Sequence, residues 1–409
     1  MVPTDADSST LSVFYDLVFL EHDPPVGAFN RPPDDRLAVA EPHPDRPERI
    51  ANIRHIVDTE LGDRTTWRSV TPASREQLAR IHDSDYLDSL QDMADRGGGR
   101  IIDTTAMSER TYDAARHAAG AAIGAARYAL AHSLDDVPYA LVRPSGHHAQ
   151  PTQADGYCYV NNAAVAVADV LAATDVPATD APADASAGGT DGDETDAEAD
   201  VGVDQVAILD WDVHPANGTQ ECFYDREDVL VVSLHGDYGV WGPNHPQENS
   251  LAERGTGAGE GYTANVPLPP GTGDAGYAEA FDRVVEPAIE AFDPDLLLVS
   301  AGQDPSRIDP DGRNLVTTEG FYDLGRRARG LAARTDAGLA LVQEGGYQIT
   351  ALAYDTLGVL CGALDLDTDA DDGPDLDDPF DHLNEYRPPA TAWIDDAVDA
   401  HAEYWPLDG

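Results

Sequence analysis

The pattern of apolar and polar positions alternates between short strand-like runs and longer helical stretches. A first strand is expected at 13–19, and later runs rich in Val, Leu and Ile predict strands at 140–142, 206–209, 229–235, 296–301 and 339–343. Segments with helical periodicity lie between them, as at 109–132 and 161–173, and 392–404 fits a closing helix. Continuous apolar runs that alternate with helices are typical of a parallel sheet buried on both faces. We therefore predict an α/β fold with an open, mostly parallel sheet and helices on both faces.

One long segment interrupts this pattern. Residues 174–204 consist mainly of Ala, Asp, Gly and Thr, with hardly any large apolar side chain. Such a segment buries too little surface to offset the entropy lost on ordering it, so we expect a disordered acidic insertion. The strand-like runs on either side belong to one repeating pattern, which favours an insertion within a domain. We accordingly expect a single domain over 11–409, preceded by a flexible N-terminus at 1–10.

The charge of the chain excludes several kinds of chemistry. Its 76 acidic and 25 basic residues give a formal net charge of −51, and every basic residue is Arg. Without lysine there is no Schiff base and no lysine of a phosphate-binding loop. The acidic excess argues against direct binding to nucleic acid or to anionic membranes, which requires clustered positive charge. A solvated surface is the simplest interpretation, and an acid-rich, lysine-free surface also suits molar salt, where like charges are screened.

Cysteine content and the length of apolar runs bear on where the protein works. Three scattered cysteines, Cys158, Cys222 and Cys361, are too few for a disulfide framework or a thiolate zinc site. The first ten residues lack the basic and apolar regions of a secretory signal, and no apolar run reaches the roughly 18 residues of a membrane span. We therefore expect a cytoplasmic protein that does not bind membranes. The sequence leaves its oligomeric state open.

Polar or ionisable residues follow each of the five later strands. The segments are, in chain order, RPSGHHA, DWDVHPANG, HGD, QDPSRID and EGGY. The carboxyl ends of parallel strands meet at one edge of a sheet, and ligands bind beyond that edge. The sequence therefore predicts a site assembled there.

The segment DWDVH points to a bound cation. Side chains alternate along a strand, so we expect extended backbone here with Asp210, Asp212 and His214 on one face and Trp211 and Val213 on the other. Buried carboxylates are strongly penalised unless they are paired, and this chain offers few cations. A divalent metal would resolve the conflict. An isolated motif of this kind is equally compatible with a strand end in water.

Other strand ends carry groups that suit acid–base chemistry. His147 and His148 are adjacent, and two imidazoles at one sheet edge can serve as general base and general acid. Asp304 follows the strand at 296–301, and Tyr347 follows two glycines, which permit close backbone approach. Taken singly, the histidines fit structural roles, Asp304 fits a loop or helix cap, and Tyr347 fits simple packing.

Together these segments resemble one family. RPSGHHA, GYCYVNNAAVA, ILDWDVHPANGTQ, VVSLHGD, SAGQDPSRIDP and QEGGY look like the histone deacetylase family in type and order. That family comprises zinc-dependent, arginase-like deacetylases and includes acetylpolyamine amidohydrolases and acetoin-utilisation proteins. The resemblance extends from His43 to about Leu364, and Asn161, Asn162 and NGTQ are similar to the class II branch. It implies a single arginase/deacetylase-like domain.

The resemblance implies a metal site. Its ligands would be Asp212, His214 and Asp304, which would hold zinc, although so oxygen-rich a set also suits ferrous iron. The implied reaction is attack of metal-activated water on an acetamide carbonyl, with His147 and His148 handling the protons.

Three further residues would complete the implied catalytic machinery. Tyr347 would donate a hydrogen bond to the developing oxyanion. Asp210 would orient His147, and Asn217 would lie behind His148.

The resemblance also implies a structural potassium ion and a substrate channel. The ion would be bound by Asp210, Asp212 and the backbone around His214, Ser233 and Leu234. A second, less specific ion site would involve Phe223, Arg226, Val229 and Tyr262. The substrate channel would be formed by Tyr157, Gly156 and Arg49, with Arg49 near an internal acetate pocket.

Two departures from the family pattern stand near the metal site. Pro215 and Ala216 replace the usual His-Gly, which removes a backbone donor and a glycine's freedom, and Gln303 is polar where relatives are aromatic or small. The nearest enzymatic rival, an arginase-like ureohydrolase with two manganese ions, needs a D-x-H-x-D arrangement, and Ala216 occupies its third acidic position. A catalytically silent acyl-lysine binding module is the other alternative.

The substrate would be an acetylated lysine or an acetylated polyamine. A negative protein attracts both, but at molar salt the attraction is screened within roughly 3 Å. Charge alone therefore does not choose between them.

Overall fold

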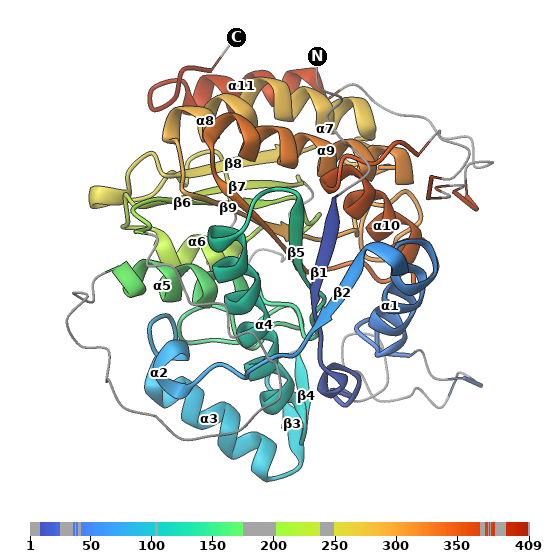
Figure 1. Cartoon of the computed structure of the whole chain (residues 1–409). Helices are drawn as coiled ribbons and strands as arrows, with labels where there is room; N and C mark the ends of the chain where they lie inside the picture. Colours follow the sequence, from blue (N-terminus) through green and yellow to red (C-terminus); the bar gives the residue numbers. More distant parts are fainter. Residues whose placement is uncertain are drawn as a thin grey trace, which may run out of the picture.

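One parallel sheet organises the molecule. The computed structural model describes residues 9–24, 36, 38–39, 42–102, 105–174, 202–237, 249–368, 373–374, 376, 378–380 and 390–407. The strands of the sheet are β1 (Thr10–Phe14), β2 (Thr65–Arg68), β5 (Asp136–Ala140), β6 (Val206–Asp210), β7 (Val229–Gly236), β8 (Thr263–Leu268), β9 (Leu296–Ala301) and β10 (Gly338–Gln343). They lie in the order β2-β1-β5-β10-β9-β6-β7-β8, and every neighbouring pair is parallel (Figure 1). The predicted α/β class with a mostly parallel sheet is confirmed.

Helices cover both faces of the sheet. One face carries α1 (Glu48–Glu60), α7 (Asp274–Ala280), α8 (Glu286–Phe292), α9 (Thr318–Thr335), α10 (Ala351–Ala363) and α11 (Thr391–His401). The other face carries α2 (Arg75–Leu78), α3 (Ser84–Asp95), α4 (Thr111–Ala131) and α5 (Asn162–Thr174). The remaining elements are α6 (Asn217–Phe223), the antiparallel pair β3 (Gly98–Arg100) and β4 (Ala106–Ser108), the 3-10 turns Leu17–Leu20, Gly62–Arg64 and Gly257–Gly259, and a π-helical turn at Phe281–Val285.

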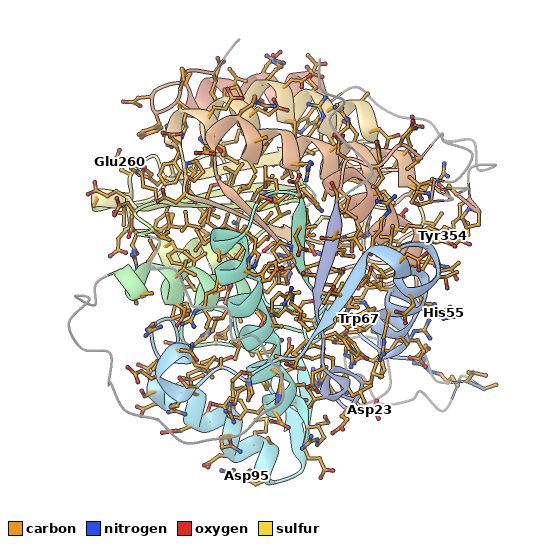
Figure 2. All side chains as sticks on the ribbon, in the orientation of Figure 1. Asp23, His55, Trp67, Asp95, Glu260 and Tyr354 are labelled. Atoms are coloured by element: carbon orange, nitrogen blue, oxygen red, sulfur yellow. The ribbon has the colours of Figure 1, made fainter. Side chains whose placement is uncertain are left out.

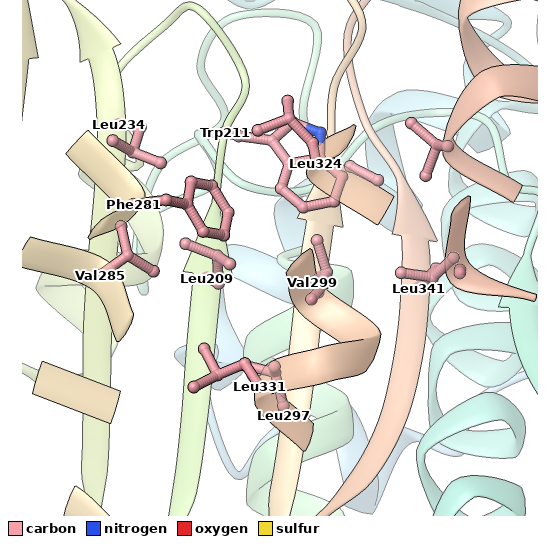
Figure 3. Close-up of a cluster of buried hydrophobic side chains, with 14 of the residues drawn as sticks. Leu209, Trp211, Leu234, Phe281, Val285, Leu297, Val299, Leu324, Leu331 and Leu341 are labelled. Carbon is pink, nitrogen blue, oxygen red and sulfur yellow. The ribbon is translucent and has the colours of Figure 1, made fainter. Parts of the chain in front are cut away.

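The alternation of side chains along the strands explains the two cores. In β6, Val206 and Ile208 face the α4 side, whereas Ala207 and Leu209 face the opposite side. Figure 3 shows Leu209 and neighbouring strand residues against Phe281 of the covering layer. Both faces are buried, which is why these strands read in the sequence as continuous apolar runs.

Of the elements predicted near the two ends of the chain, the last helix is confirmed and the first strand is partly wrong. The closing helix is confirmed as α11, which is tied to β8 by a hydrogen bond of 2.9 Å between His401 Nε2 and Asn265 O. The strand predicted at 13–19 was wrong beyond Phe14, because β1 covers Thr10–Phe14. Its apolar run continues as the 3-10 turn Leu17–Leu20 because the Asp16 carboxylate caps Val18 N at 2.8 Å.

Several expectations concern residues outside the described ranges. Nearly all of the insertion predicted at 174–204 and residues 1–8 of the N-terminus are among them. In the part of the chain that is described, no helix combines the length and apolar character needed to span a membrane. Exposed acids such as Asp23, Asp95 and Glu260 lie at widely separated points of the periphery (Figure 2).

Candidate functional site

Four consecutive strands deliver the predicted polar segments to one edge of the sheet. β5, β10, β9 and β6 are neighbours, and all run in the same direction. The residues that follow them include His147 and His148 after β5, Tyr347 after β10, Asp304 after β9 and Asp212 after β6. The prediction that these segments meet at one edge is therefore confirmed.

Three buried donors form a cluster at this edge. His214 Nδ1 lies 3.2 Å from Asp212 Oδ1 and 3.0 Å from Asp304 Oδ2. One ligand atom from each of the three residues lies within 4.8 Å of the other two. Asp212 and Asp304 are fully buried. Two buried carboxylates facing one imidazole carry an excess of negative charge, which a divalent cation would balance.

The remaining oxygen atoms of the two carboxylates are held by backbone amides. Asp304 Oδ1 accepts from Val213 N at 2.8 Å, and Asp212 Oδ2 accepts from Gly345 N at 2.8 Å. Asp212 Oδ1 also accepts from His214 N at 2.9 Å. The donors are thus oriented by the loops that carry them, as a preformed metal site requires.

Two glycines allow the backbone to pack directly against these carboxylates. A Cβ atom at Gly302 would lie 2.2 Å from Asp212 Oδ2. A Cβ atom at Gly345 would lie 2.2 Å from Asp304 Oδ2 and 2.5 Å from Asp212 Oδ2. Donor types and burial therefore fit a bound divalent ion, and any side chain at either glycine would displace the donors.

The expectation that extended backbone continues through His214 was wrong. Strand β6 ends at Asp210, and Asp210 Oδ1 accepts a hydrogen bond from Asp212 N at 2.9 Å. This local bond competes with the strand ladder and turns the chain, so Asp212 and His214 lie in a turn beyond the strand. Asp210 faces His147, whereas Asp212 and His214 face Asp304.

The two adjacent histidines lie beside the donor cluster and have different partners. His147 Nδ1 is 3.0 Å from Asp210 Oδ2, and His147 Nε2 is 3.7 Å from Asp212 Oδ2. His148 Nδ1 is 2.5 Å from Asn217 Oδ1. The ring centroids are 4.0 Å apart. The structure thus brings together both predicted histidines and both of their predicted supports.

Their electrostatic surroundings differ as well. Burial alone would lower the pKa of His147, but Asp212 and Asp210 raise it to about 10. Burial and the neighbouring His147 lower the pKa of His148 well below its usual range. A cation held by Asp212 would offset part of the rise at His147. The two rings are therefore distinct proton carriers rather than equivalent ones.

The predicted channel residues gather around Tyr347. The ring of Tyr157 meets that of Tyr347 edge-on, with centroids 5.7 Å apart, and the Arg49 guanidinium lies 4.7 Å from the Tyr347 centroid. Gly156 has a positive φ of 49°, and a Cβ atom there would lie 2.1 Å from the His148 ring. Gly156 therefore allows the chain to pass directly against His148.

A buried ionic network that the sequence did not reveal holds Arg49. Asp45 Oδ1 accepts from Arg49 Nη1 at 2.6 Å and from Arg143 Nε at 2.8 Å. Arg49 Nη2 also donates to Glu344 O at 2.7 Å. Asp45 lies two residues after His43, where the resemblance begins, but nothing in its spacing indicates a partner at Arg143.

Two buried acids support the loops that carry His147 and Tyr347 and were also missed. Glu344 Oε2 accepts from Gly146 N at 2.7 Å and from His147 N at 3.2 Å. Asp309 Oδ2 accepts from Tyr347 N at 2.6 Å. Both acids lie within the segments QEGGY and SRIDP, but their partners are backbone amides of distant segments, which no side-chain pattern reports.

The predicted potassium ligands are partly adjacent. Asp210 and Ser233 are register partners in the parallel pair β6 and β7. The Ser233 hydroxyl lies 3.3 Å from Ala216 N, so it faces the turn that contains His214. Leu234 is fully buried, and only its backbone could serve an ion. In the second predicted site, Arg226 N donates to Phe223 O at 3.1 Å, and Tyr262 O accepts from Val231 N at 2.9 Å.

Both departures from the family pattern are accommodated. Ala216 has φ −74°, a conformation that needs no glycine, and α6 begins directly after it. Gln303 is buried. Its amide donates to Ala301 O at 2.8 Å and accepts from Gln343 Nε2 at 2.7 Å, beneath the turn that carries Tyr347.

A second metal centre is poorly supported within the described residues. Besides the cluster above, only His147, Cys158 and Glu344 come close enough together there. Burial raises the pKa of the Cys158 thiol well above its usual range, and Glu344 is engaged by two backbone amides. Ala216, at the third position of the ureohydrolase motif, is fully buried and offers no ligand. The geometry thus argues against a two-metal centre.

The sequence is similar to a defined family over most of its length. The family model described as histone deacetylase domain matches residues 43–177 and 195–362. The chain is 38% identical over 408 residues to histone deacetylase 8 of Arabidopsis thaliana, covering 98% of each chain. It is 36% identical to the histone deacetylase-like amidohydrolase of Pseudomonas aeruginosa, covering 82% of this chain and 79% of that one. It is 34% identical to a probable deacetylase of Archaeoglobus fulgidus, with coverage of 89% and 94%.

The fold is similar to that of a solved structure. The crystal structure of the HDA15 HD domain superposes with a TM-score of 0.76 at 28% identity, covering 98% of this chain and 96% of that one. The similarity thus extends over the whole sheet and its helical layers.

Proposed function

Because the chain belongs to the histone deacetylase family and is a metal-dependent deacetylase, we propose that it hydrolyses N-acetylated amines at the cluster of Asp212, His214 and Asp304. The observation that carries this assignment is the position of His147 Nε2, 3.7 Å from Asp212 Oδ2, beside three buried donors. A proton carrier next to a set of metal ligands supplies the two parts that hydrolysis of an unactivated amide needs.

We propose zinc as the metal, with ferrous iron as the alternative that the oxygen-rich donor set allows. When bound, the ion would polarise the acetamide carbonyl and lower the pKa of water. Three protein ligands leave room for both. His214 would bind through Nδ1, the atom that faces both carboxylates.

The protein's own groups would move the protons. One ring of the pair His147 and His148 takes the proton from the attacking water, and the other delivers a proton to the departing amine nitrogen. The Asp210 carboxylate fixes the orientation of His147 and stabilises its charged form. Asn217 fixes the ring of His148. Each ring is therefore oriented through its Nδ1 atom.

Tyr347 would stabilise the oxyanion that forms when water adds to the carbonyl. Its ring is fixed by Tyr157 and Arg49, so its hydroxyl is preorganised. We propose that Tyr157 and Gly156 line the entrance for the acyl group.

A potassium ion bound by Asp210, Asp212 and the backbone around His214, Ser233 and Leu234 is a further proposal. The register pairing of Asp210 with Ser233 supports it. The ion would offset the charge of two adjacent buried carboxylates.

We propose acetylated lysine side chains or acetylated polyamines as substrates, and a cytoplasm rich in salt as the working environment. The composition, with 76 acidic residues and no lysine, supports the second proposal. Comparing acetate release from an acetyl-lysine peptide, an acetylpolyamine and a longer-chain acyl-lysine peptide in molar potassium chloride would distinguish the substrates.

Carboxylates at the two ends of β9 provide the test of the site. Asp304 follows the strand, and Asp295 precedes it at the opposite edge of the sheet. We expect Asp304→Asn to lower zinc content and acetate release together, and Asp295→Asn to keep both. Full zinc content and turnover in Asp304→Asn would refute the assignment.

A further inference from the structure

Tyr347 lies in a turn that is itself neither strand nor helix. β10 ends at Gln343 and α10 begins at Ala351. The backbone between them is held by side chains and by a hydrogen bond of 3.0 Å from Gln303 N to Gly345 O. Gly345 N donates to Asp212 Oδ2 at 2.8 Å, and Gly346 O accepts from Arg49 Nε.

The amide of Tyr347 itself is held by Asp309. Asp309 Oδ2 accepts from Tyr347 N at 2.6 Å and from Gln348 N at 3.2 Å. Tyr347 is buried, so without Asp309 its amide would lack this partner inside the protein. The carboxylate thus accepts the hydrogen bonds that backbone carbonyls of a neighbouring strand accept within the sheet.

The other oxygen of Asp309 binds its own loop. Asp309 Oδ1 accepts from Asp311 N at 2.9 Å and from Gly312 N at 3.2 Å. Gly312 packs on the metal-ligand segment, since a Cβ atom there would lie 1.8 Å from Asp304 O. A single carboxylate therefore joins the loop of Asp304 to the turn of Tyr347.

We propose that Asp309 is a positioning residue, which fixes the Tyr347 hydroxyl relative to the metal-binding loop and contributes to turnover only through that hydroxyl. The proposal rests on the function proposed for Tyr347. It makes Asp309 dispensable for catalysis once the hydroxyl is gone, which a general structural role would not.

Asp309→Asn is the informative variant. It keeps the shape of the side chain, but its amide group turns a donor toward one of the two pairs of N–H groups. The matched control is Asp295→Asn. Asp295 Oδ2 also accepts from two successive amides, Asp204 N at 2.7 Å and Gln205 N at 3.0 Å, but at the opposite edge of the sheet.

The experiment is a double-mutant cycle on zinc-loaded protein, with kcat, KM, zinc content and melting temperature measured for each variant. We expect Asp309→Asn to lower kcat roughly 10- to 100-fold with little change in KM and full zinc content. In a Tyr347→Phe background the same change should cost less than about twofold. Asp295→Asn should leave kcat unchanged in both backgrounds.

Equal losses in the two backgrounds, or no loss in the wild-type background, would overturn the proposal. If Asp309→Asn does not fold, hydrogen exchange in the unmodified enzyme decides. The Tyr347 and Gln348 amides should exchange as slowly as those of β10, and rapid exchange would overturn the proposal. A Tyr347→Phe enzyme with full turnover would refute the proposed function itself, whatever Asp309 does.

Discussion

Gly345, in the turn that carries Tyr347, packs against the two carboxylates of the proposed metal site, and adding one methyl group there should damage the site. A Cβ atom would lie 2.2 Å from Asp304 Oδ2 and 2.5 Å from Asp212 Oδ2. Close carbon–oxygen contacts in proteins run at about 3.3 Å. One or both carboxylates must therefore move by roughly 1 Å when Gly345 becomes Ala.

The magnitude follows from how little a metal site tolerates. Ligand distances hold to within about 0.2 Å, so the displacement is several times the tolerance and affects two of the three proposed ligands. Even changes to groups that merely orient ligands cost 10- to 100-fold in affinity, or about 1.4 to 2.8 kcal/mol. We expect Gly345→Ala to weaken zinc binding by at least that factor, at a folding cost of about 1 to 3 kcal/mol for overpacking.

Zinc affinity is measured by titration against a competing chelator, with acetate release and melting temperature measured on the same samples. Gly99→Ala is the matched control, because a Cβ atom there would meet only Met93, with its Sδ atom at 3.7 Å. It should keep wild-type affinity. A folded Gly345→Ala protein that binds zinc within about twofold of wild type would refute the ligand assignment.

Three further predictions test other parts of the molecule. Tyr347→Phe should keep zinc and lower kcat by about 10²- to 10³-fold, because only an oxyanion donor is lost, and a loss below fivefold would contradict that role. His82 Nδ1 lies 3.1 Å from Gln150 O, and its Nε2 accepts from Asn161 N at 2.9 Å, so the ring must be neutral. Burial lowers its pKa to about 4, so as the pH falls from about 6.5 to 4 the unfolded chain binds the proton first and stability is lost by up to about 1.4 kcal/mol per pH unit. His82→Gln should flatten the dependence of melting temperature on pH in this window, and an unchanged slope would count against the argument. Replacing potassium chloride by equimolar tetramethylammonium chloride should lower the melting temperature. The loss in the free energy of unfolding is about 2.7 kcal/mol if the potassium concentration had been 100 times its Kd. Identical melting temperatures in the two salts would argue against the potassium site.

The sequence was most informative where local pattern and tertiary role coincide. Val206 to Leu209 read as a buried strand because both faces of the sheet are covered, and Asp304 was recognisable because it follows such a strand. Prediction failed where a hydrogen bond from a backbone amide to a nearby Asp side chain replaced the strand conformation. Asp16 ended β1 early, and Asp210 turned the chain before Asp212, although both segments have strand-like alternation.

Asp309 and Glu344 were beyond prediction for another reason. Motif reading pairs side chains with side chains, whereas these two acids bind backbone amides. Glu344 reaches Gly146 N across 198 positions of sequence, and Asp309 reaches Tyr347 N across 38. Every residue except proline has such an amide, so composition and spacing do not indicate which amide a buried acid will bind.

The same contacts explain how loops at the end of a sheet can hold a site rigidly. Each carboxylate of the site binds at least one backbone amide: Asp210 binds Asp212 N, Asp212 binds Gly345 N, Asp304 binds Val213 N, Glu344 binds His147 N and Asp309 binds Tyr347 N. Most of these bonds cross from one strand end to another, so the loops after β5, β6, β9 and β10 form one connected network. An acid removed from it leaves both a missing charge and an unpaired buried amide on a neighbouring loop. Substitutions at different acids should therefore be strongly non-additive in turnover, and nearly additive effects would mean that the loops are held independently.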